Sequence, residues 1–274
     1  MTASPLPSRS TEFLVTKEYR RFAEFCDACR DNRYIGLCYG APGVGKTVSA
    51  REYAHWGDLD RLLGPPPYRS SGVPAPDSGP WRTVLYTPGV INTPRTVARE
   101  VDGLWAAVIG AAARTTTWYA TEHPTGARPP APDLVIVDEA DRLKTASLEQ
   151  LRDFYDRQHV GVVLLGMPGL QKRLARYAQL YSRVGFVHQF RPLSGQELQG
   201  VIEHQWVQLG FDTALDHQPD GALINAIARV TGGNFRLVER LFAQIDRIVA
   251  INELPRVTTE VVALARERLV LGPE

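Results

Sequence analysis

The stretch Tyr34-Ile-Gly-Leu-Cys-Tyr-Gly-Ala-Pro-Gly-Val-Gly-Lys-Thr47 decides the fold. Its first six residues form a short, mostly apolar run typical of a buried strand, and its last eight have the spacing G-x-x-x-x-G-K-[ST]. Glycines in this spacing let the backbone wrap a phosphate group with its N–H groups at the start of a helix. A glycine-rich turn that matches by chance is the alternative. The strand before the loop and the helical pattern after it favour a phosphate-binding loop.

The same loop offers ligands for a nucleotide and its metal ion. The Lys46 side chain can reach the β- and γ-phosphates of ATP, and the Thr47 hydroxyl can hold Mg²⁺. The residues that we expect to bind the nucleotide are Gly40, Pro42, Gly43, Val44, Gly45, Lys46, Thr47 and Val48. The expected cofactors are therefore ATP and Mg²⁺.

A second apolar run, Leu134-Val-Ile-Val137, ends in two adjacent carboxylates, Asp138 and Glu139. A strand that ends here places Asp138 near the shell of a bound Mg²⁺, as a metal ligand beside Thr47. Glu139 can polarise the water that attacks the γ-phosphate. Two carboxylates at a strand end can also be an ordinary solvated turn, but the phosphate loop upstream favours the catalytic interpretation.

Composition and charge exclude several classes of protein. The chain has 274 residues, of which 44% are hydrophobic and 22% are charged, so it can bury a core and is not disordered in bulk. The formal net charge is +1, so any contact with nucleic acid has to come from a local basic patch. No apolar run approaches the roughly 18 to 20 residues that span a bilayer, and the first residues lack a secretory signal pattern. We therefore expect a cytoplasmic protein with no membrane contact.

Strand and helix signals alternate along most of the chain. Besides the two runs above, apolar runs at 81–87, 160–165 and 184–190 indicate strands, with helical spacing between them. This alternation predicts an α/β fold with a mostly parallel sheet that is covered on both faces. Residues 1–12 are rich in Ser, Pro and Thr and indicate a flexible arm. Residues 13–190 are then the α/β domain, and residues 191–274 are helical.

Several helix starts are indicated by capping residues. The stretches 147–150 and 194–197, each a Ser followed three residues later by Gln or Glu, resemble capping boxes, and Asn234 is a typical N-cap residue.

The first predicted helix, residues 17–30, carries Cys26 and Cys29. We expect two small buried residues one turn apart, because a metal site needs a second ligand pair and the sequence has no well-spaced one. With only three cysteines in all, a disulfide framework is not expected.

The two motifs, the extra strand between them and the helical C-terminal part together resemble an AAA+ ATPase over residues 13–270. The resemblance implies a RecA-like five-stranded parallel sheet sandwiched by helices, in the strand order 5-1-4-3-2, with a small C-terminal helical lid at 191–274. The letters Asp138-Glu-Ala-Asp141 also spell the DEAD box of a helicase family. That family needs two RecA-like domains, for which this chain is too short.

The AAA+ resemblance also implies roles for two arginines. In such assemblies the nucleotide lies between subunits, and Arg183, in the Ser-Arg before the last core strand, matches the arginine that acts on the neighbouring subunit's site. A surface arginine that caps the strand is the alternative, and Arg173 and Arg176 are weaker candidates for the same role. Arg236, which follows a Gly-Gly-Asn turn, matches the sensor-2 arginine that reaches from the lid to the γ-phosphate.

One position departs from the family pattern. The end of the fourth strand normally carries a polar residue that positions water, whereas here it reads Leu165-Gly-Met-Pro168. The expected catalytic set is Glu139, Arg183 and Arg236. Without the polar residue at the fourth strand, we expect an ATPase that is slow and regulatory.

Within the family, residues 166–170 and 182–186 look most similar to transposon target-selector ATPases, the TnsC, TniB and MuB kind. This resemblance implies a regulator that self-assembles into a ring or helical filament on double-stranded DNA and selects targets for, or activates, a transposase. The near-neutral charge is compatible, because a filament multiplies a few contacts per subunit. The alternatives are another DNA-linked AAA+ ATPase, such as a helicase loader or initiator, and a nucleotide-gated signalling switch.

DNA contacts are expected near the start of the helix after the second strand, where N–H groups suit a phosphate. The candidates there and in the loop that follows this helix are Thr93, Arg95, Arg99, Arg114 and Thr116. The alternative for each is an ordinary solvated polar residue. A second basic face, at 172–176, is a rival DNA surface or part of a subunit interface.

Overall fold

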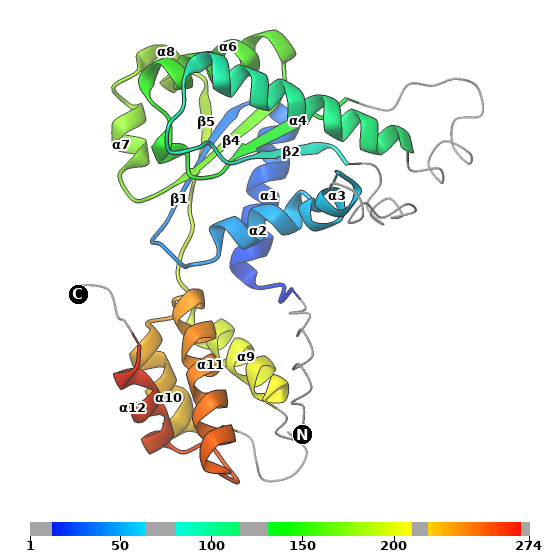
Figure 1. Ribbon diagram of the computed structural model, residues 1–274. Coiled ribbons are helices and arrows are strands. Elements are labelled where there is room, and N and C mark those ends of the chain that lie inside the picture. The colour runs from blue at the N-terminus through cyan, green and yellow to red at the C-terminus, as the bar shows by residue number, and fades with distance from the viewer. Residues whose placement is uncertain (1–12, 64–80, 115–130, 210–218, 270–274) are drawn as a thin grey trace.

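Five parallel strands form the centre of the computed structural model, which describes residues 13–63, 81–114, 131–209 and 219–269 (Figure 1). The strands are β1 (Ile35–Tyr39), β2 (Thr83–Tyr86), β3 (Leu134–Val137), β4 (Gly161–Gly166) and β5 (Val184–Gln189). Their order across the sheet is β2-β3-β4-β1-β5, and every pair of neighbours is parallel. The predicted α/β class and strand order are both confirmed.

Helices cover both faces of this sheet (Figure 1). One face carries α1 (Lys17–Asn32), α2 (Lys46–Tyr53) and α3 (Trp56–Leu63), and the other carries α4 (Pro94–Arg114), α6 (Thr145–Gln158), α7 (Leu170–Leu174) and α8 (Ala178–Tyr181). A short 3₁₀ turn, η1 (Ala140–Arg142), follows β3. The described elements after β5 are all helices: α9 (Gly195–Gln208), α10 (Gly221–Thr231), α11 (Phe235–Asn252) and α12 (Thr259–Glu267).

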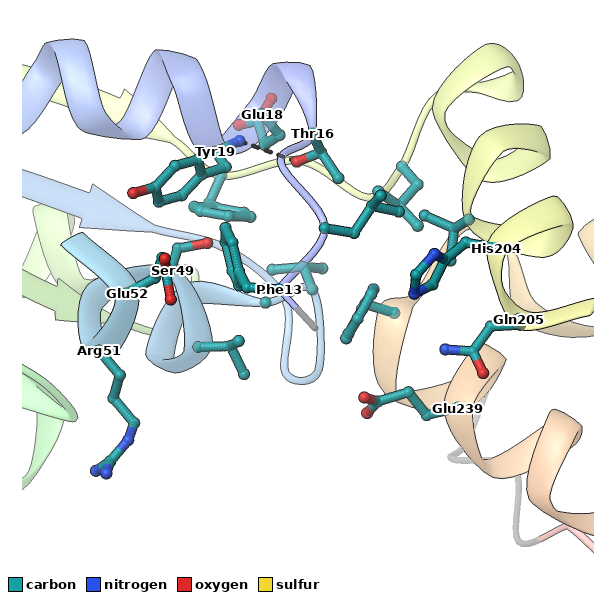
Figure 2. A pocket seen from close by; sticks show the side chains of 18 of the residues that line it. Phe13, Thr16, Glu18, Tyr19, Ser49, Arg51, Glu52, His204, Gln205 and Glu239 are labelled. Carbon is teal, nitrogen blue, oxygen red and sulfur yellow. Dashed lines mark hydrogen bonds between the residues drawn. The ribbon is translucent and has the colours of Figure 1, made fainter. Parts of the chain in front are cut away.

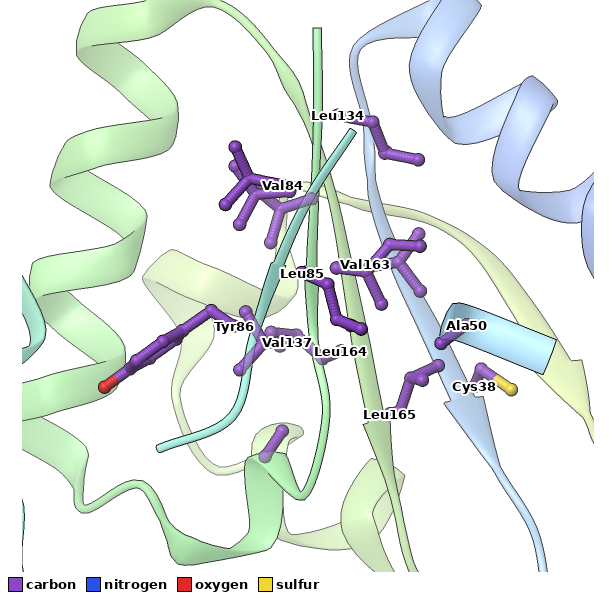
Figure 3. Packing of buried hydrophobic residues seen from close by; sticks show 14 of the residues in the cluster. Cys38, Ala50, Val84, Leu85, Tyr86, Leu134, Val137, Val163, Leu164 and Leu165 are labelled. Carbon is purple, nitrogen blue, oxygen red and sulfur yellow. The ribbon is translucent and has the colours of Figure 1, made fainter. Parts of the chain in front are cut away.

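The centre of the sheet is buried on both faces, which explains its continuous apolar strands. All four residues of β3 and all six of β4 are buried, and their side chains pack against those of β2 and β1 (Figure 3). The helices α9–α12 bury a second, separate cluster of their own around Ile202, Leu241 and Ile245. The chain therefore has one core in the sheet and one among the C-terminal helices.

The strand order determines where a site can form. In a parallel sheet all carboxyl ends lie at one edge, and β1 lies between β4 and β5 although the chain continues from it to the far strand β2. Such a reversal opens a crevice at the carboxyl ends of the strands. The loop at 40–45 after β1 and the turn at 138–142 after β3 therefore reach the same edge.

The structure corrects one predicted capping box and confirms another. Helix α6 begins at Thr145 behind an extended Lys144, so Ser147 lies inside the helix, fully buried. It faces the core with Leu148, which is why it does not cap. The predicted box at 194–197 is present at the start of α9, and Asn234 caps α11 as expected.

Two further boundaries differ from expectation. The Pro, Gly and Ser content of residues 57–80 predicts a loop, but helix α3 extends to Leu63, because Trp56 and Leu59 bury one face at helical spacing. The apolar spacing of residues 170–177 predicts one helix, but α7 ends at Leu174 and a separate helix, α8, begins at Ala178, because Tyr177 has a non-helical backbone.

The predicted arm at 1–12 lies outside the described residues. Of the helices that the structure does describe, none has both the length and the apolar content needed to cross a bilayer.

The cysteines of α1 are buried packing residues, as expected. Cys26 and Cys29 are free thiols with no exposed surface, and burial raises the pKa of the Cys29 thiol to about 12. Cys29 packs directly on Gly36 of β1, where an added Cβ would lie 2.3 Å from its Sγ atom and 2.7 Å from the Phe25 ring. The close approach of α1 to the sheet depends on this glycine.

We expect Gly36→Ala to lower the free energy of unfolding by about 1–3 kcal/mol, because the added methyl group overpacks the contact between α1 and β1. Gly103→Ala is the matched control, since nothing lies within 4 Å of its added Cβ on the exposed side of α4. It should stabilise the chain by about 0.5–1 kcal/mol through helix propensity. Urea unfolding measures the change in unfolding free energy of both variants. Changes of the same sign and size would show that the packing of α1 does not depend on Gly36.

Candidate nucleotide-binding site

The loop after β1 has the backbone that the sequence motif requires. Gly43 has φ 79° and Gly45 has φ 111°, both in the left-handed region that favours glycine. Gly40 has a different reason to be glycine, because an added Cβ would lie 2.4 Å from the carbonyl oxygen of Phe190. The three glycines together let the loop turn tightly and deliver Lys46 to the first position of α2.

The Lys46 ammonium lies over this loop and fits a phosphate group. Its Nζ atom donates hydrogen bonds to the carbonyl oxygens of Gly40 at 2.7 Å and Ala41 at 2.9 Å. Burial lowers the pKa of Lys46, and the nearby Asp138 carboxylate opposes that shift. In the described part of the chain no carboxylate forms an ion pair with Lys46, so its positive charge is available to an anionic ligand.

The two carboxylates after β3 have different surroundings. Asp138 is buried, and its Oδ1 atom accepts a hydrogen bond from the backbone N–H of Glu139 at 2.9 Å. Glu139 has a left-handed backbone, with φ 52°, and its half-exposed carboxylate forms an ion pair with Arg142. Asp138 is thus fixed in place, whereas Glu139 has a partner that it can exchange.

A polar group that sequence reasoning missed lies at the end of β4. The Oδ2 atom of Asp141 accepts a hydrogen bond from the backbone N–H of Met167 at 2.6 Å. Asp141 lies so close to β4 that an added Cβ on Gly166 would be 2.4 Å from this oxygen. Strand β4 carries no polar side chain at its end, as expected, but the Asp141 carboxylate from the turn after β3 lies beside it. The signal in the sequence was the spacing of Asp138 and Asp141 within one turn.

The C-terminal helices reach the same loop through the start of α11. Asn234 donates from Nδ2 to the carbonyl oxygen of Pro42 at 2.8 Å, and the backbone N–H of Arg236 donates to the carbonyl oxygen of Gly43 at 2.9 Å. An added Cβ on Gly43 would lie 2.6 Å from Asn234. The two cores of the chain therefore meet at the phosphate-binding loop.

These parts enclose a cavity of about 190 Å³. It is lined by the loop residues from Pro42 to Val48 apart from Val44, and by Asp138, Glu139, Asp141, Gly166, Met167, Phe235, Arg236 and Glu239. The structure therefore brings Lys46, Thr47, Asp138, Glu139 and Arg236 together around one cavity. Gly40 and Val44 lie outside this lining, although Gly40 binds the Lys46 ammonium.

A larger cavity of about 400 Å³ adjoins the first one (Figure 2). The two share the lining residues Gly45, Val48, Phe235 and Glu239. In Figure 2, Phe13, Tyr19 and Glu52 lie on the side of the sheet domain, and His204 and Gln205 lie on the side of α9. Its walls are largely apolar, from Val44, Val48, Phe190, Leu193, Val201 and Phe235.

The polar groups of the larger cavity are few. His204 has a buried Nε2 atom that makes no hydrogen bond within the described residues. Burial, with a smaller effect of Glu52, raises the pKa of Tyr19 to about 12, so that its hydroxyl stays protonated. Sequence reasoning missed this cavity because its residues come from segments 13–19, 44–57, 190–205 and 235–239, and no motif links them.

Arg183 lies away from both cavities of its own chain. It immediately precedes β5, at the amino-terminal edge of the sheet, whereas the phosphate-binding loop is at the carboxyl edge. Its guanidinium binds Asp156 through two hydrogen bonds, at 2.7 Å and 2.9 Å. Of its rivals, Arg173 is engaged with the carbonyl oxygens of Asp141 and Leu143, and Arg176 is exposed.

Three of the candidate DNA contacts, Thr93, Arg95 and Arg99, lie at the start of α4. Thr93 caps the helix, because its hydroxyl oxygen accepts from the backbone N–H of Thr96 at 3.2 Å. Arg95 and Arg99 are exposed one turn apart, and neither forms an ion pair within the residues that the structure describes. Arg114 ends α4, and Thr116 lies outside the described residues.

Comparison with known proteins identifies relatives. The family model described as "AAA domain" matches residues 29–174. A protein of Staphylococcus aureus named "Potential ATP-binding protein" is 42% identical over 269 residues, which cover 97% of this chain and 99% of that protein. The Mu-like prophage FluMu DNA transposition protein B of Haemophilus influenzae is 24% identical over 249 residues, or 84% of this chain and 71% of that protein.

Solved structures share the fold. The RuvB Holliday junction branch migration motor of Thermotoga maritima has a TM-score of 0.56 at 18% identity, covering 95% of this chain and 72% of that one. The ORC1 protein of Aeropyrum pernix in complex with DNA has a TM-score of 0.57 at 18% identity, covering 96% of this chain and 67% of that one. At these identities the likeness establishes the arrangement of sheet and helices.

The bond from Asn234 to the loop can be tested alone, because serine keeps the N-cap but is too short to reach Pro42. We expect Asn234→Ser to weaken the binding of a fluorescent ATP analogue by about three- to tenfold, the effect of one lost hydrogen bond. Asp220→Ser is the control, since Asp220 caps α10 in the same way, away from the loop. Unchanged affinity in Asn234→Ser, or equal loss in both variants, would contradict the assignment.

Proposed function

Because the chain belongs to the AAA domain family of ATPases, we propose that it binds ATP across the two adjoining cavities and hydrolyses it slowly. We further propose that it assembles on double-stranded DNA to direct or activate a transposase. The observation that carries the first part is the convergence of a phosphate-binding loop, two strand-end carboxylates and Arg236 on one cavity. The proposed role in transposition is supported by the similarity to the relative from Haemophilus influenzae, which is named a DNA transposition protein.

The smaller cavity suits the phosphates. Gly43 and Gly45 keep the loop backbone open to an anion, and Lys46 exchanges its two carbonyl partners for phosphate oxygens. Mg²⁺ bound with ATP would neutralise charge on the β- and γ-phosphates, held by Thr47 and Asp138. Arg236, at the start of α11, adds positive charge from the side of the C-terminal helices. We propose that residues 191–274, which include these helices, act as a lid over the phosphate cavity.

The larger cavity suits the adenosine part of ATP. It is apolar, it adjoins the phosphate cavity through shared residues, and His204 and Gln205 offer a few polar atoms to a base. A ligand that fills both cavities contacts segment 13–19, α2, α9 and α11 at once. Binding ATP would therefore draw the sheet domain and the lid together.

Hydrolysis requires Glu139 to accept a proton from the attacking water. In this chain its carboxylate is paired with Arg142, and the polar group at the end of β4 is the Asp141 carboxylate rather than a neutral side chain. Both features are consistent with turnover that is slow without a partner. Arg183 would complete the site of a neighbouring subunit once it leaves Asp156.

Binding to DNA would depend on assembly. The net charge of +1 gives a monomer little attraction for DNA. In a filament, however, the phosphate contacts made by Arg95 and Arg99 of each subunit, on adjacent turns of α4, would add up. A helicase loader or initiator remains the alternative within DNA-linked ATPases, supported only by the fold that the chain shares with ORC1 and RuvB. A signalling switch is the alternative that needs no DNA.

Electron microscopy with duplex DNA tests the proposal most directly. We expect regular filaments or stacked rings with a non-hydrolysable ATP analogue, none with ADP, and none with Lys46→Ala under either condition. Assembly that ignores DNA would favour the switch, and assembly with ADP would contradict nucleotide control.

The salt dependence of DNA binding tests the contacts on α4. Arg95→Ala should lower the affinity for all DNA sequences alike and reduce the slope of log affinity against log salt by about 0.9 per lost phosphate contact. Arg229→Ala, an exposed arginine of α10, is the control.

Mixed assemblies test whether Arg183 acts across a subunit interface. Arg183→Ala should leave ATP binding by the monomer nearly intact but lower turnover in the assembly, by up to about 10³-fold for an arginine that acts in trans. Glu139→Gln should retain ATP binding and lose turnover. A mixture of the two variants should recover activity, because some interfaces pair an intact Glu139 with an intact Arg183. If well-mixed assemblies stay inactive, Arg183 does not act in trans.

A further inference from the structure

The two adjoining cavities meet at a boundary that carries a carboxylate. Of the described residues, Gly45, Val48, Phe235 and Glu239 line both cavities. The first three have no polar side-chain atom, so Glu239 supplies the polar side chain of this shared lining. In Figure 2 Glu239 extends from α11 toward the side of the sheet domain. A ligand that fills both cavities therefore passes this carboxylate.

The covalent order of ATP fixes which of its parts lies at this boundary. With the triphosphate in the smaller cavity and the base in the larger one, the ribose between them lies against the shared residues. The ribose carries two neighbouring hydroxyl groups, on C2′ and C3′, and each can donate a hydrogen bond. Val48 and Phe235 can pack against the carbon atoms of the sugar, but their side chains cannot accept a hydrogen bond from its hydroxyls.

The Glu239 carboxylate has the chemistry to accept both. It forms no hydrogen bond or ion pair within the part of the chain that the structure describes, although Arg236 lies one turn earlier on α11. An ionised carboxylate only accepts hydrogen bonds and has about four lone-pair sites, so one carboxylate can serve two neighbouring hydroxyls. Such charge-assisted bonds are stronger than those between neutral groups. An acidic side chain binds a ribose hydroxyl in this way in dinucleotide-binding folds.

Partial desolvation makes the carboxylate a better acceptor for a ligand. Burial raises the pKa of Glu239, and the charge of Arg236 opposes that shift. A carboxylate that has lost part of its hydration gains more from a new hydrogen-bond donor than a fully hydrated one does. The hydroxyls of a bound sugar would replace the water that the folded chain has removed.

A negative charge beside a triphosphate needs a reason. Lys46 and Arg236 line the smaller cavity and supply the positive charge that phosphates require. For the phosphates alone, a neutral side chain at position 239 would be the better choice, because a carboxylate repels them. The carboxylate is therefore better suited to the sugar than to the phosphates.

The other carboxylates of the site are placed less well for the ribose. Glu18 is buried and already accepts a hydrogen bond from the backbone N–H of Arg191 at 3.1 Å. Glu52 lines the larger cavity from α2 but does not line the smaller one, so it lies away from the shared boundary. The carboxylates that follow β3 line the smaller cavity alone. Glu239 is the carboxylate that reaches both.

Resting on the proposed binding of ATP across the two cavities, we propose that Glu239 recognises the ribose and selects the class of nucleotide. Its carboxylate accepts hydrogen bonds from the 2′- and 3′-hydroxyls. The site thereby prefers ribonucleoside triphosphates to deoxyribonucleoside triphosphates. This preference comes from the C-terminal helices and is separate from the contacts that hold the phosphates.

Isothermal titration calorimetry of the full chain with the Mg²⁺ complexes of ATP, 2′-deoxy-ATP and 3′-deoxy-ATP tests this selection. The unmodified chain should bind ATP about three- to tenfold more tightly than either analogue, because each analogue lacks one hydrogen bond to the carboxylate. In Glu239→Ala the three affinities should agree within about twofold, since no acceptor remains. Glu239→Gln keeps one acceptor oxygen without the charge, so its preference should be intermediate.

Two further variants show whether the effect belongs to Glu239. Alanine and glutamine both favour helix, and residue 239 is exposed on α11, so both Glu239 variants should fold. Glu203→Gln is the matched control, because Glu203 is an exposed carboxylate of α9 that lines neither cavity. Glu52→Gln removes the rival carboxylate of the larger cavity. Both should retain the full preference for ATP. Loss of the preference in Glu52→Gln but not in Glu239→Ala would overturn the proposal.

Failure of this proposal and failure of the proposed ATP site give different results. If none of the three nucleotides binds, the ATP site is wrong and the role of Glu239 falls with it. If all three bind the unmodified chain equally well, the ATP site stands and ribose selection is overturned. If Glu239→Ala weakens all three by the same factor, Glu239 acts on another part of the nucleotide, which also overturns ribose selection.

Discussion

The parallel pairing of β4 with β1 on one side and β3 on the other is the constraint on which the rest of the molecule depends. It places Tyr39 of β1 opposite Gly166 of β4, so the phosphate-binding loop and the end of β4 lie at one level. The turn after β3 then delivers two carboxylates to the same place. Because these strands are packed on both faces, a shift of register would disrupt the packing on both sides of the sheet, and the site is as fixed as the core.

Directional hydrogen bonds join the two cores beside the larger, mostly apolar cavity. Glu18 is buried, and its carboxylate accepts a hydrogen bond from the backbone N–H of Arg191 at 3.1 Å. The backbone N–H of Glu18 in turn donates to the carboxylate of Glu197 at 3.0 Å, which also accepts from the N-cap residue Ser194 in the capping box of α9. Together with the contacts from Asn234 to the loop, these few directional bonds join the C-terminal helices to the sheet. Directional bonds of this kind fix how the C-terminal helices meet the sheet.

Several arginines that could act on phosphates or partners are held within the monomer. Arg183 is bound to Asp156, Arg173 to backbone carbonyl oxygens, and Arg142 to Glu139. Partly exposed ion pairs of this kind contribute little to stability, about 0–1 kcal/mol each. They can therefore exchange partners readily, as the proposed assembly would require.

The sequence alone determined the parts of the site that lie close together in the chain. The loop at 40–47 needs glycines at fixed spacing, and the apolar run before Asp138 indicates a buried strand, so the sequence predicts that Lys46, Asp138 and Glu139 lie at one site. The strand order and Arg236 followed from the family resemblance. The tertiary structure alone decided everything that joins distant segments: the larger cavity, the Asp141 carboxylate beside β4, the pairing of Arg183 with Asp156, and the position of Glu239 between the two cavities. Periodicity and motifs record which face of an element is buried, but these contacts depend on where the ends of different elements meet, which only the packed sheet fixes.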